Sequence, residues 1–138
     1  MTEGFYVMFT AEGNFHGHAN TLADFYVATP WHKPLRGEWE CALTEITLEC
    51  PQGTGERVFV CSDALRENYV NDNRLQLLRN VELDAQGKAQ RTFLDHRYIA
   101  LIPGSREYLH FFLLKNTLTP VTSNGGKLFC VIHFRPKL

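Results

Sequence analysis

The chain has 138 residues, which suits one domain over residues 1–138 with a single sandwich-sized core. Its residues are 44% hydrophobic and 12% aromatic, which predicts a folded chain rather than a disordered one. With 14 basic and 15 acidic residues the formal net charge is -1. This balance argues against direct nucleic-acid binding, because neutralising phosphates requires a broad basic surface.

The first ten residues lack the basic start, apolar run and small-residue cleavage site of an export signal. No stretch approaches the roughly 18 apolar residues of a membrane span. We therefore expect a soluble, intracellular protein with reduced cysteines. Cys41, Cys61 and Cys130 lie in apolar alternations, where we expect them to be buried, and Cys50 is placed in a loop.

Alternation of apolar and polar residues at period two dominates the chain and predicts strands. Residues 4–10 and 22–29 are the first two alternating blocks, and each is followed by turn residues. The longest block covers residues 37–49. Its apolar face slips by one residue at Thr44-Glu45, which predicts a β-bulge there.

Residues 57–61 are apolar on both faces, as in a strand at the centre of a sheet. Residues 63–79 have the only helical character and are allowed one short helix or turn. The remaining strands are expected at residues 81–83, 88–94 beside the Gln86-Gly87 turn, 98–102, 107–114 and 127–134. Short strands separated by Gly and Pro turns predict an all-β fold, an antiparallel β-sandwich of the single jelly-roll type with about eight strands.

Residues 109–114 and 128–134 are so apolar that both faces of each strand need cover. One face can pack in the sandwich core. The other face needs either a loop of the same chain or a neighbouring subunit, and the sequence leaves both possibilities open.

His16 and His18 could hold one metal ion in a cupin-like site if they lie on one strand. The nearest following carboxylate, Asp24, and the distant histidines lack the spacing of such a site, so a solvated loop is favoured. Ser62 and Asp63 could be combined with a histidine into a hydrolase triad, but the G-x-S-x-G elbow is absent.

Glu38, Glu40 and Glu45 could supply a glycosidase carboxylate pair. Glu38 and Glu40 alternate with Trp39, however, so we expect them on the solvated face of a half-buried strand. No P-loop, dinucleotide fingerprint or C-x-x-C pair is present. The sequence therefore predicts no catalytic residue, no metal site and no cofactor.

Several short motifs follow one another along the chain. They are Asn20-Thr21 followed by Phe25, Leu35-x-Gly37-x-Trp39-Glu40-x-Ala42-Leu43-x-Glu45-Ile46, Val60-Cys61-Ser62-Asp63, Tyr69-Val70-Asn71-Asp72, Leu77-Leu78-Arg79-Asn80-Val81 and Ile132-His133-Phe134-Arg135-Pro136. In this order they resemble the motifs of the minor capsid, or penton, proteins of Polinton/Maverick elements and adintoviruses.

The resemblance implies a structural protein with one jelly roll, whose homopentamer forms the vertex capsomer of an icosahedral double-stranded DNA virus or virus-like transposon. Its expected partners are further copies of itself and a double jelly-roll major capsid protein. Its expected location is the virion, assembled inside the host cell. A host gene domesticated from such an element would carry the same motifs.

Structural roles are expected for the motif residues. Trp39 is an anchor of the core, Gly37 serves the turn before that strand, and Glu45 marks the bulge, where Arg79 or Arg135 is its natural counter-ion. The other motif residues singled out are Asn20, Thr21, Glu40, Asp63, Leu78, His133 and Phe134.

Two other functions compete with the capsid interpretation. A carbohydrate- or ligand-binding β-sandwich would place exposed aromatic residues such as Trp31, Tyr26 or Tyr108 around a concave face. A cupin-like enzyme would hold a transition metal. The number of subunits in solution distinguishes the capsid protein from both, because only the capsomer requires five.

Overall fold

The computed structural model describes residues 4–29, 37–51, 56–70, 72–104, 107–121 and 126–137. All regular structure within these ranges is β, and none of the described residues belongs to a helix that could cross a membrane. Of the short helix or turn allowed over residues 63–79, the structure has the turn. A small hairpin of β7 (Asn68–Val70) and β8 (Asn73–Leu75) follows it. The end of that stretch belongs to strand β9 (Leu77–Glu82), so the strand predicted at residues 81–83 begins four residues earlier than expected.

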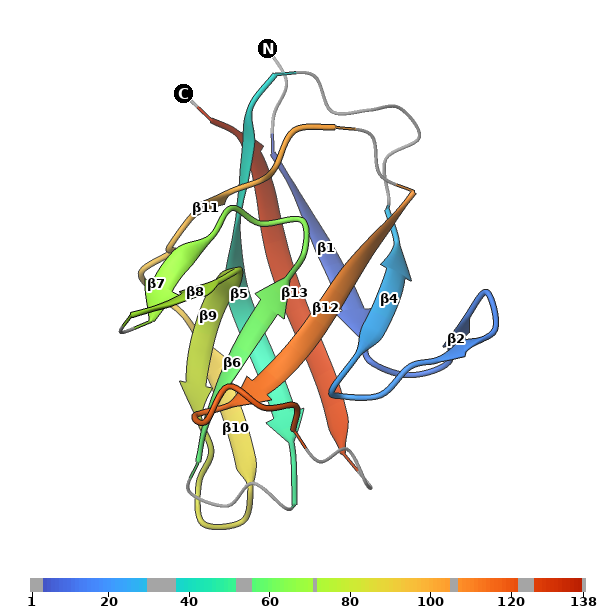
Figure 1. Ribbon diagram of the computed structural model, residues 1–138, viewed down its shortest axis with the longest axis vertical. Coiled ribbons are helices and arrows are strands. Elements are labelled where there is room, and N and C mark those ends of the chain that lie inside the picture. Colours follow the sequence, from blue (N-terminus) through green and yellow to red (C-terminus); the bar gives the residue numbers. More distant parts are fainter. Residues whose placement is uncertain are drawn as a thin grey trace.

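Two sheets contain the long strands (Figure 1). The five-stranded sheet has the order β1 (Phe5–Thr10), β13 (Lys127–Pro136), β5 (Trp39–Glu49) and β10 (Lys88–Thr92), with β11 (Ile99–Ala100) also pairing with β5. The four-stranded sheet has the order β4 (Phe25–Ala28), β12 (Tyr108–Lys115), β6 (Arg57–Ser62) and β9 (Leu77–Glu82). The hairpin of β2 (Asn14–Phe15) and β3 (His18–Ala19) lies at one side of the molecule, and β7–β8 lies at the other.

The pairing of the eight long strands is that of a jelly roll. The first pairs with the last, β1 with β13, and the next pairs inward are β4 with β12, β5 with β10 and β6 with β9, all antiparallel. A chain folded back on itself in this way and rolled into two packed sheets has the jelly-roll topology. The predicted all-β sandwich of about eight strands is therefore confirmed.

The slip in the hydrophobic pattern of β5 is a real bulge. Ile132 of β13 pairs with Leu43, and the preceding Val131 pairs with Glu45, so Thr44 is the extra residue. The Thr44 hydroxyl donates to the Val131 carbonyl over 3.1 Å, which satisfies the carbonyl at the irregularity. Without the extra residue, every apolar side chain after it would point to the wrong face.

The core between the sheets is built from the inward faces of the long strands. Aromatic rings cross it, with Phe111 4.8 Å from Phe9 and 5.4 Å from Phe25 between ring centroids. All four cysteines are buried and free. Cys50 lies outside the strands as predicted, yet it is only 3% exposed, because the chain after β5 turns over the end of the core.

A second apolar cluster lies on the outward side of the four-stranded sheet. Its buried residues are Phe59, Cys61 and Leu75, and the partly buried Val70, Leu77, Phe112, Leu114 and Leu118 pack against them. The β7–β8 hairpin and the turn after β12 contribute to this cluster. The second face of β12 is therefore covered by the same chain.

The second face of β13 has no equivalent cover among the described residues. It belongs to a surface that we name the β1–β13 outer face, formed by Tyr6, Met8, Phe129, Val131 and His133. Tyr6 is 63% exposed, Met8 70% and Phe129 36%. Large apolar side chains thus stay in contact with solvent on the isolated chain.

Candidate functional site

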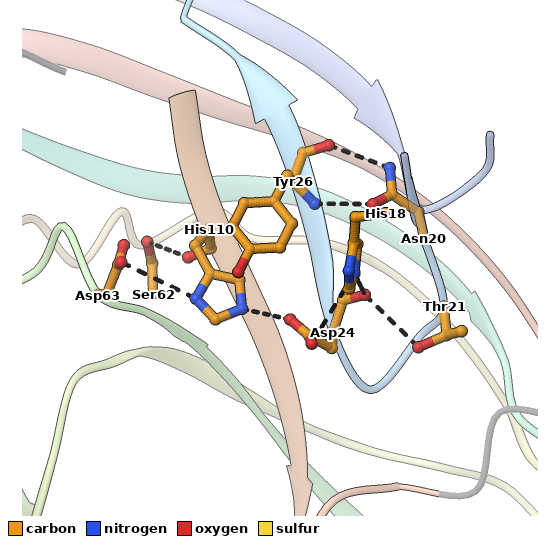
Figure 2. Close-up of polar contacts among 8 residues, drawn as sticks. All are labelled: His18, Asn20, Thr21, Asp24, Tyr26, Ser62, Asp63 and His110. Carbon is orange, nitrogen blue, oxygen red and sulfur yellow. Dashed lines mark hydrogen bonds and ion pairs between the residues drawn. The ribbon is translucent and has the colours of Figure 1, made fainter. Parts of the chain in front are cut away.

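Two histidines and two aspartates meet where β3, β4, β6 and β12 come together (Figure 2). We name His18, Asp24, Asp63 and His110 the imidazole–carboxylate cluster. His110 Nε2 makes a short hydrogen bond with Asp24 Oδ1, and His110 Nδ1 lies 3.8 Å from Asp63 Oδ2. His18 Nε2 lies 3.8 Å from Asp24 Oδ2 and 3.2 Å from the Asp24 carbonyl oxygen. The cluster therefore joins three stretches of the chain that are far apart in the sequence, since His18 and Asp24 are only six residues apart.

Asn20 and Thr21 build the turn that positions Asp24. The Asn20 side chain accepts a hydrogen bond from the Tyr26 amide and donates one to the Tyr26 carbonyl, each over 3.0 Å. Thr21 and Asp24 exchange backbone hydrogen bonds of 3.1 and 3.2 Å. Asn20 thus acts as a short strand partner for the start of β4, which explains its place beside a tight turn.

Ser62 and Asp63 lie beside His110, but not as a nucleophile triad. The Ser62 hydroxyl donates to the backbone carbonyl of His110 over 2.8 Å, and its oxygen accepts from the Ala64 amide. Ser62 is 1% exposed, and both ring nitrogens of His110 face carboxylates. These contacts hold the segments around Asp24, Ser62 and His110 together. A triad would instead need the serine hydroxyl to be hydrogen-bonded to the imidazole.

An aromatic groove adjoins the imidazole–carboxylate cluster. Its volume is about 380 Å³, and its lining residues are Phe15, His16, His18, Tyr26, Ala28, Glu107 and Tyr108. The structure brings together Tyr26 and Tyr108, the aromatic residues expected around a concave face, whereas Trp31 lies outside the described residues.

Tyr26 connects the groove to the cluster. Its ring stacks on His110 with centroids 4.4 Å apart and an angle of 13°, while His18 meets it edge-on at 4.8 Å. Burial raises the pKa of the Tyr26 hydroxyl, and the nearby Asp24, Tyr108 and Asp63 raise it further. These surroundings disfavour the phenolate further, in keeping with a ring that packs between two imidazoles.

His16 and His18 do not share one strand, so the condition for a cupin-like pair is not met, and His16 lies in a turn. His16 and Gly17 have φ values of 47° and 86° and occupy the tight turn between β2 and β3, while His18 begins β3. Positive φ at both central residues is typical of a two-residue hairpin turn. Both imidazoles line the groove, and the described ranges contain no group of three or more His, Cys, Asp or Glu suited to hold a metal.

Three residues of the sequence motifs meet on the outward side of the five-stranded sheet. Arg135 Nε donates to Glu40 Oε2 over 2.6 Å, and its guanidinium lies 3.3 Å from the centroid of the Tyr98 ring. The Tyr98 hydroxyl is 2.8 Å from His133 Nδ1. Burial lowers the pKa of His133, and Arg135 and His96 lower it further. Glu40 was expected to be solvated, but its side chain is 15% exposed because Arg135 lies against it.

The expected counter-ions of Glu45 pair with other carboxylates. Arg79 binds Asp95 over 3.1 Å and lies 3.8 Å above the Phe93 ring, and Arg135 binds Glu40. That expectation is wrong, because among the described residues neither arginine forms an ion pair with Glu45. Of the other motif residues, Trp39, Leu78 and Phe134 lie in the core, and Gly37 has a φ of 77° in the bend before β5.

Sequence reasoning missed Phe15, Glu107 and the pairing of Asp24 with His110. One signal was present for His110, which is the polar residue within the apolar run 109–114. A polar side chain in such a strand needs a partner when it is partly buried. Nothing in the sequence indicates that the partner is Asp24, since the contact spans 86 residues.

No protein-family model and no curated protein matches the chain in sequence. Its fold is similar to that of the mavirus penton protein, whose crystal structure was determined with selenomethionine-labelled protein. The match covers 97% of this chain and 99% of that chain, with a TM-score of 0.56 and 5% sequence identity. At this identity the likeness shows the fold alone, a single jelly roll like that of a penton protein.

Proposed function

We propose that this chain is a structural, non-enzymatic capsid protein whose homopentamer forms the penton at the vertices of an icosahedral shell. The observation that carries the proposal is the end-to-end match of its jelly roll to the mavirus penton protein. The ordered sequence motifs support the same assignment and favour a relative of the Polinton/Maverick and adintovirus penton proteins.

In this proposal residues 1–138 act as one jelly-roll domain in the virion, beside a double jelly-roll major capsid protein. The chain makes no direct contact with nucleic acid, in agreement with its formal net charge of -1. A domesticated host copy would keep the fold and the pentamer without building a shell.

The β1–β13 outer face is the surface that we assign to contact between subunits. Tyr6 pairs with His133 and Met8 with Val131 in register, so their side chains form one continuous patch on two neighbouring strands. The ring of Tyr6 also contacts that of His133, with centroids 4.5 Å apart and an angle of 37°. A ring of five subunits requires a head-to-tail interface, so this patch would meet a different surface of the neighbour.

The number of subunits tests the proposal directly. We expect light scattering after size exclusion to give the mass of five chains and negative-stain electron microscopy to show five-fold rings. A monomer at high protein concentration would refute the pentamer.

Two matched variants test the assigned surface. Tyr6→Lys combined with Met8→Lys should dissociate the ring, because charges would be buried without partners at the interface. Leu94→Lys is the control, since Leu94 is 95% exposed and lies outside the β1–β13 outer face. If the parent chain and both variants are pentamers, the proposed pentamer is retained and the assignment of the β1–β13 outer face to the subunit interface is refuted.

A further inference from the structure

The aromatic groove is a concave site that the proposed capsid function does not use. The β2–β3 hairpin supplies one wall, and the edge strand β4 with the start of β12 supplies the other. Its volume of about 380 Å³ lies within the range of roughly 300–1,000 Å³ found for pockets that hold small ligands. Such pockets combine apolar surface with a few polar groups, as this groove does.

The apolar part of the groove is a continuous aromatic surface. Phe15 is nearly parallel to Tyr26, with centroids 6.1 Å apart and an angle of 15°. Tyr108 meets Tyr26 at 5.3 Å and 69°, and it meets Phe15 at 5.7 Å. One side of Tyr26 is already occupied by His110, whereas Tyr108 is 45% exposed. Tyr108 is therefore the ring most available to a ligand.

The polar part of the groove surrounds these rings. Glu107 precedes Tyr108 and offers a carboxylate, which accepts hydrogen bonds when ionised. His16 can donate from one ring nitrogen and accept at the other. His18 contacts Asp24 through Nε2, which leaves its Nδ1 for a ligand. The face of an aromatic ring is electron-rich and attracts weakly positive C–H groups. Together these groups suit a molecule with C–H groups on one face and hydroxyl groups around its edge.

The described residues of the groove disfavour two other classes of ligand. Its described lining includes neither lysine nor arginine, so a phosphate, a sulfate or an acidic sugar would find Glu107 without a cationic partner. The rings of Phe15 and Tyr26, 6.1 Å apart, leave no room for an ammonium group between them, as an aromatic cage requires.

We propose that the groove binds a neutral saccharide. One pyranose ring stacks on Tyr108, and its hydroxyl groups donate to Glu107 and bond with His16 and His18. This site is formed within one copy of the chain and does not depend on the capsomer. A carbohydrate-binding site and a pentamer can therefore be tested separately, and either can fail alone.

The test uses the full chain in its native oligomeric state. A neutral-glycan array identifies a binder, and NMR titration with the methyl glycosides of glucose, galactose, mannose and N-acetylglucosamine locates it. We expect the resonances of Phe15, Tyr26 and Tyr108 to shift. Tyr108→Ala should weaken binding about tenfold, and Glu107→Gln should weaken it several-fold.

The matched control is Tyr69→Ala, since Tyr69 is a 69% exposed tyrosine on β7 and lies outside the groove. It should leave binding unchanged, and all three variants should keep the melting temperature of the parent because the replaced side chains are exposed. The proposal is overturned if no neutral saccharide binds, if the shifts lie elsewhere, or if choline or a sulfated glycan binds the groove more tightly than the neutral sugars.

Discussion

Strands β12 and β13 carry the same apolar pattern on both faces, yet their outward faces end in different surroundings. The outward face of β12 packs into a second cluster with Phe59, Cys61 and Leu75, beneath the β7–β8 hairpin. Strand β13 pairs along its edge with β1, and on the outward side of these two strands Met8 and Phe129 are exposed. An apolar pattern on both sides of a strand thus predicts that both faces will be buried. The fold decides which of these faces is buried by other segments of the same chain.

The largest difference between the two faces should appear in how much a substitution on each face lowers the free energy of unfolding. Phe59→Ala removes a ring that is 7% exposed in the covered cluster and should lower the free energy of unfolding by about 3–5 kcal/mol. Met8→Ala changes a 70% exposed side chain and should alter it by no more than about 0.5 kcal/mol. Urea denaturation at concentrations where the chain is monomeric measures both, and equal losses would contradict the comparison.

Thiol chemistry gives a second contrast. Burial raises the pKa of Cys61 in the covered cluster from 9.0 to about 12, which lowers its thiolate fraction at pH 8 by about a thousandfold. A cysteine introduced by Met8→Cys on the exposed face should react with a disulfide reagent as an ordinary thiol. Labelling followed by peptide mass spectrometry measures the two rates. Rapid modification of Cys61 in the folded protein would show that the β7–β8 cover opens readily.

The edge strand β4 of the four-stranded sheet is held by side-chain hydrogen bonds from Asn20. Asn20→Ala removes both hydrogen bonds to the Tyr26 backbone and should cost about 1–3 kcal/mol in urea denaturation. Asn20→Asp keeps an acceptor for the Tyr26 amide but loses the donor to its carbonyl, so its loss should be smaller. Equal stability of Asn20→Ala and the parent would show that β4 is held in place without this side chain.

The smallest effect is expected at His133 on the exposed β1–β13 outer face. Its pKa is lowered in the folded chain, so the unfolded chain binds more protons as the pH falls below about 6.5. The contribution of His133 to the free energy of unfolding should therefore become less favourable from pH 7.5 to 5.5, and His133→Gln should remove that contribution. Urea denaturation at both values tests this, and no contribution is expected between pH 7.5 and 8.5. An unchanged pH dependence in His133→Gln would contradict it.

Much of the fold follows from the sequence because burial imposes a period on it. Trp39, Leu43 and Ile46 predict the long strand β5 and the bulge within it, since only an extra residue keeps them all on the core face. The candidate sites do not follow in the same way. A tight turn and the pairing of distant strands bring His16, His18 and Glu107 together, and neither produces a periodic pattern in the sequence.

The amino-acid sequence alone determined the all-β class, the positions of most long strands and the bulge at Thr44, because each depends on residues close together in the chain. The exception is β9, which begins inside the stretch that has helical character in the sequence. Only the tertiary structure decided that Asp24 binds His110 and that Arg135 covers Glu40. It also decided that the outward face of β12 packs into a second cluster, whereas Phe129 on the outward face of β13 stays exposed among the described residues. These contacts join segments up to 95 residues apart, and their partners are selected by the order of strands in the two sheets.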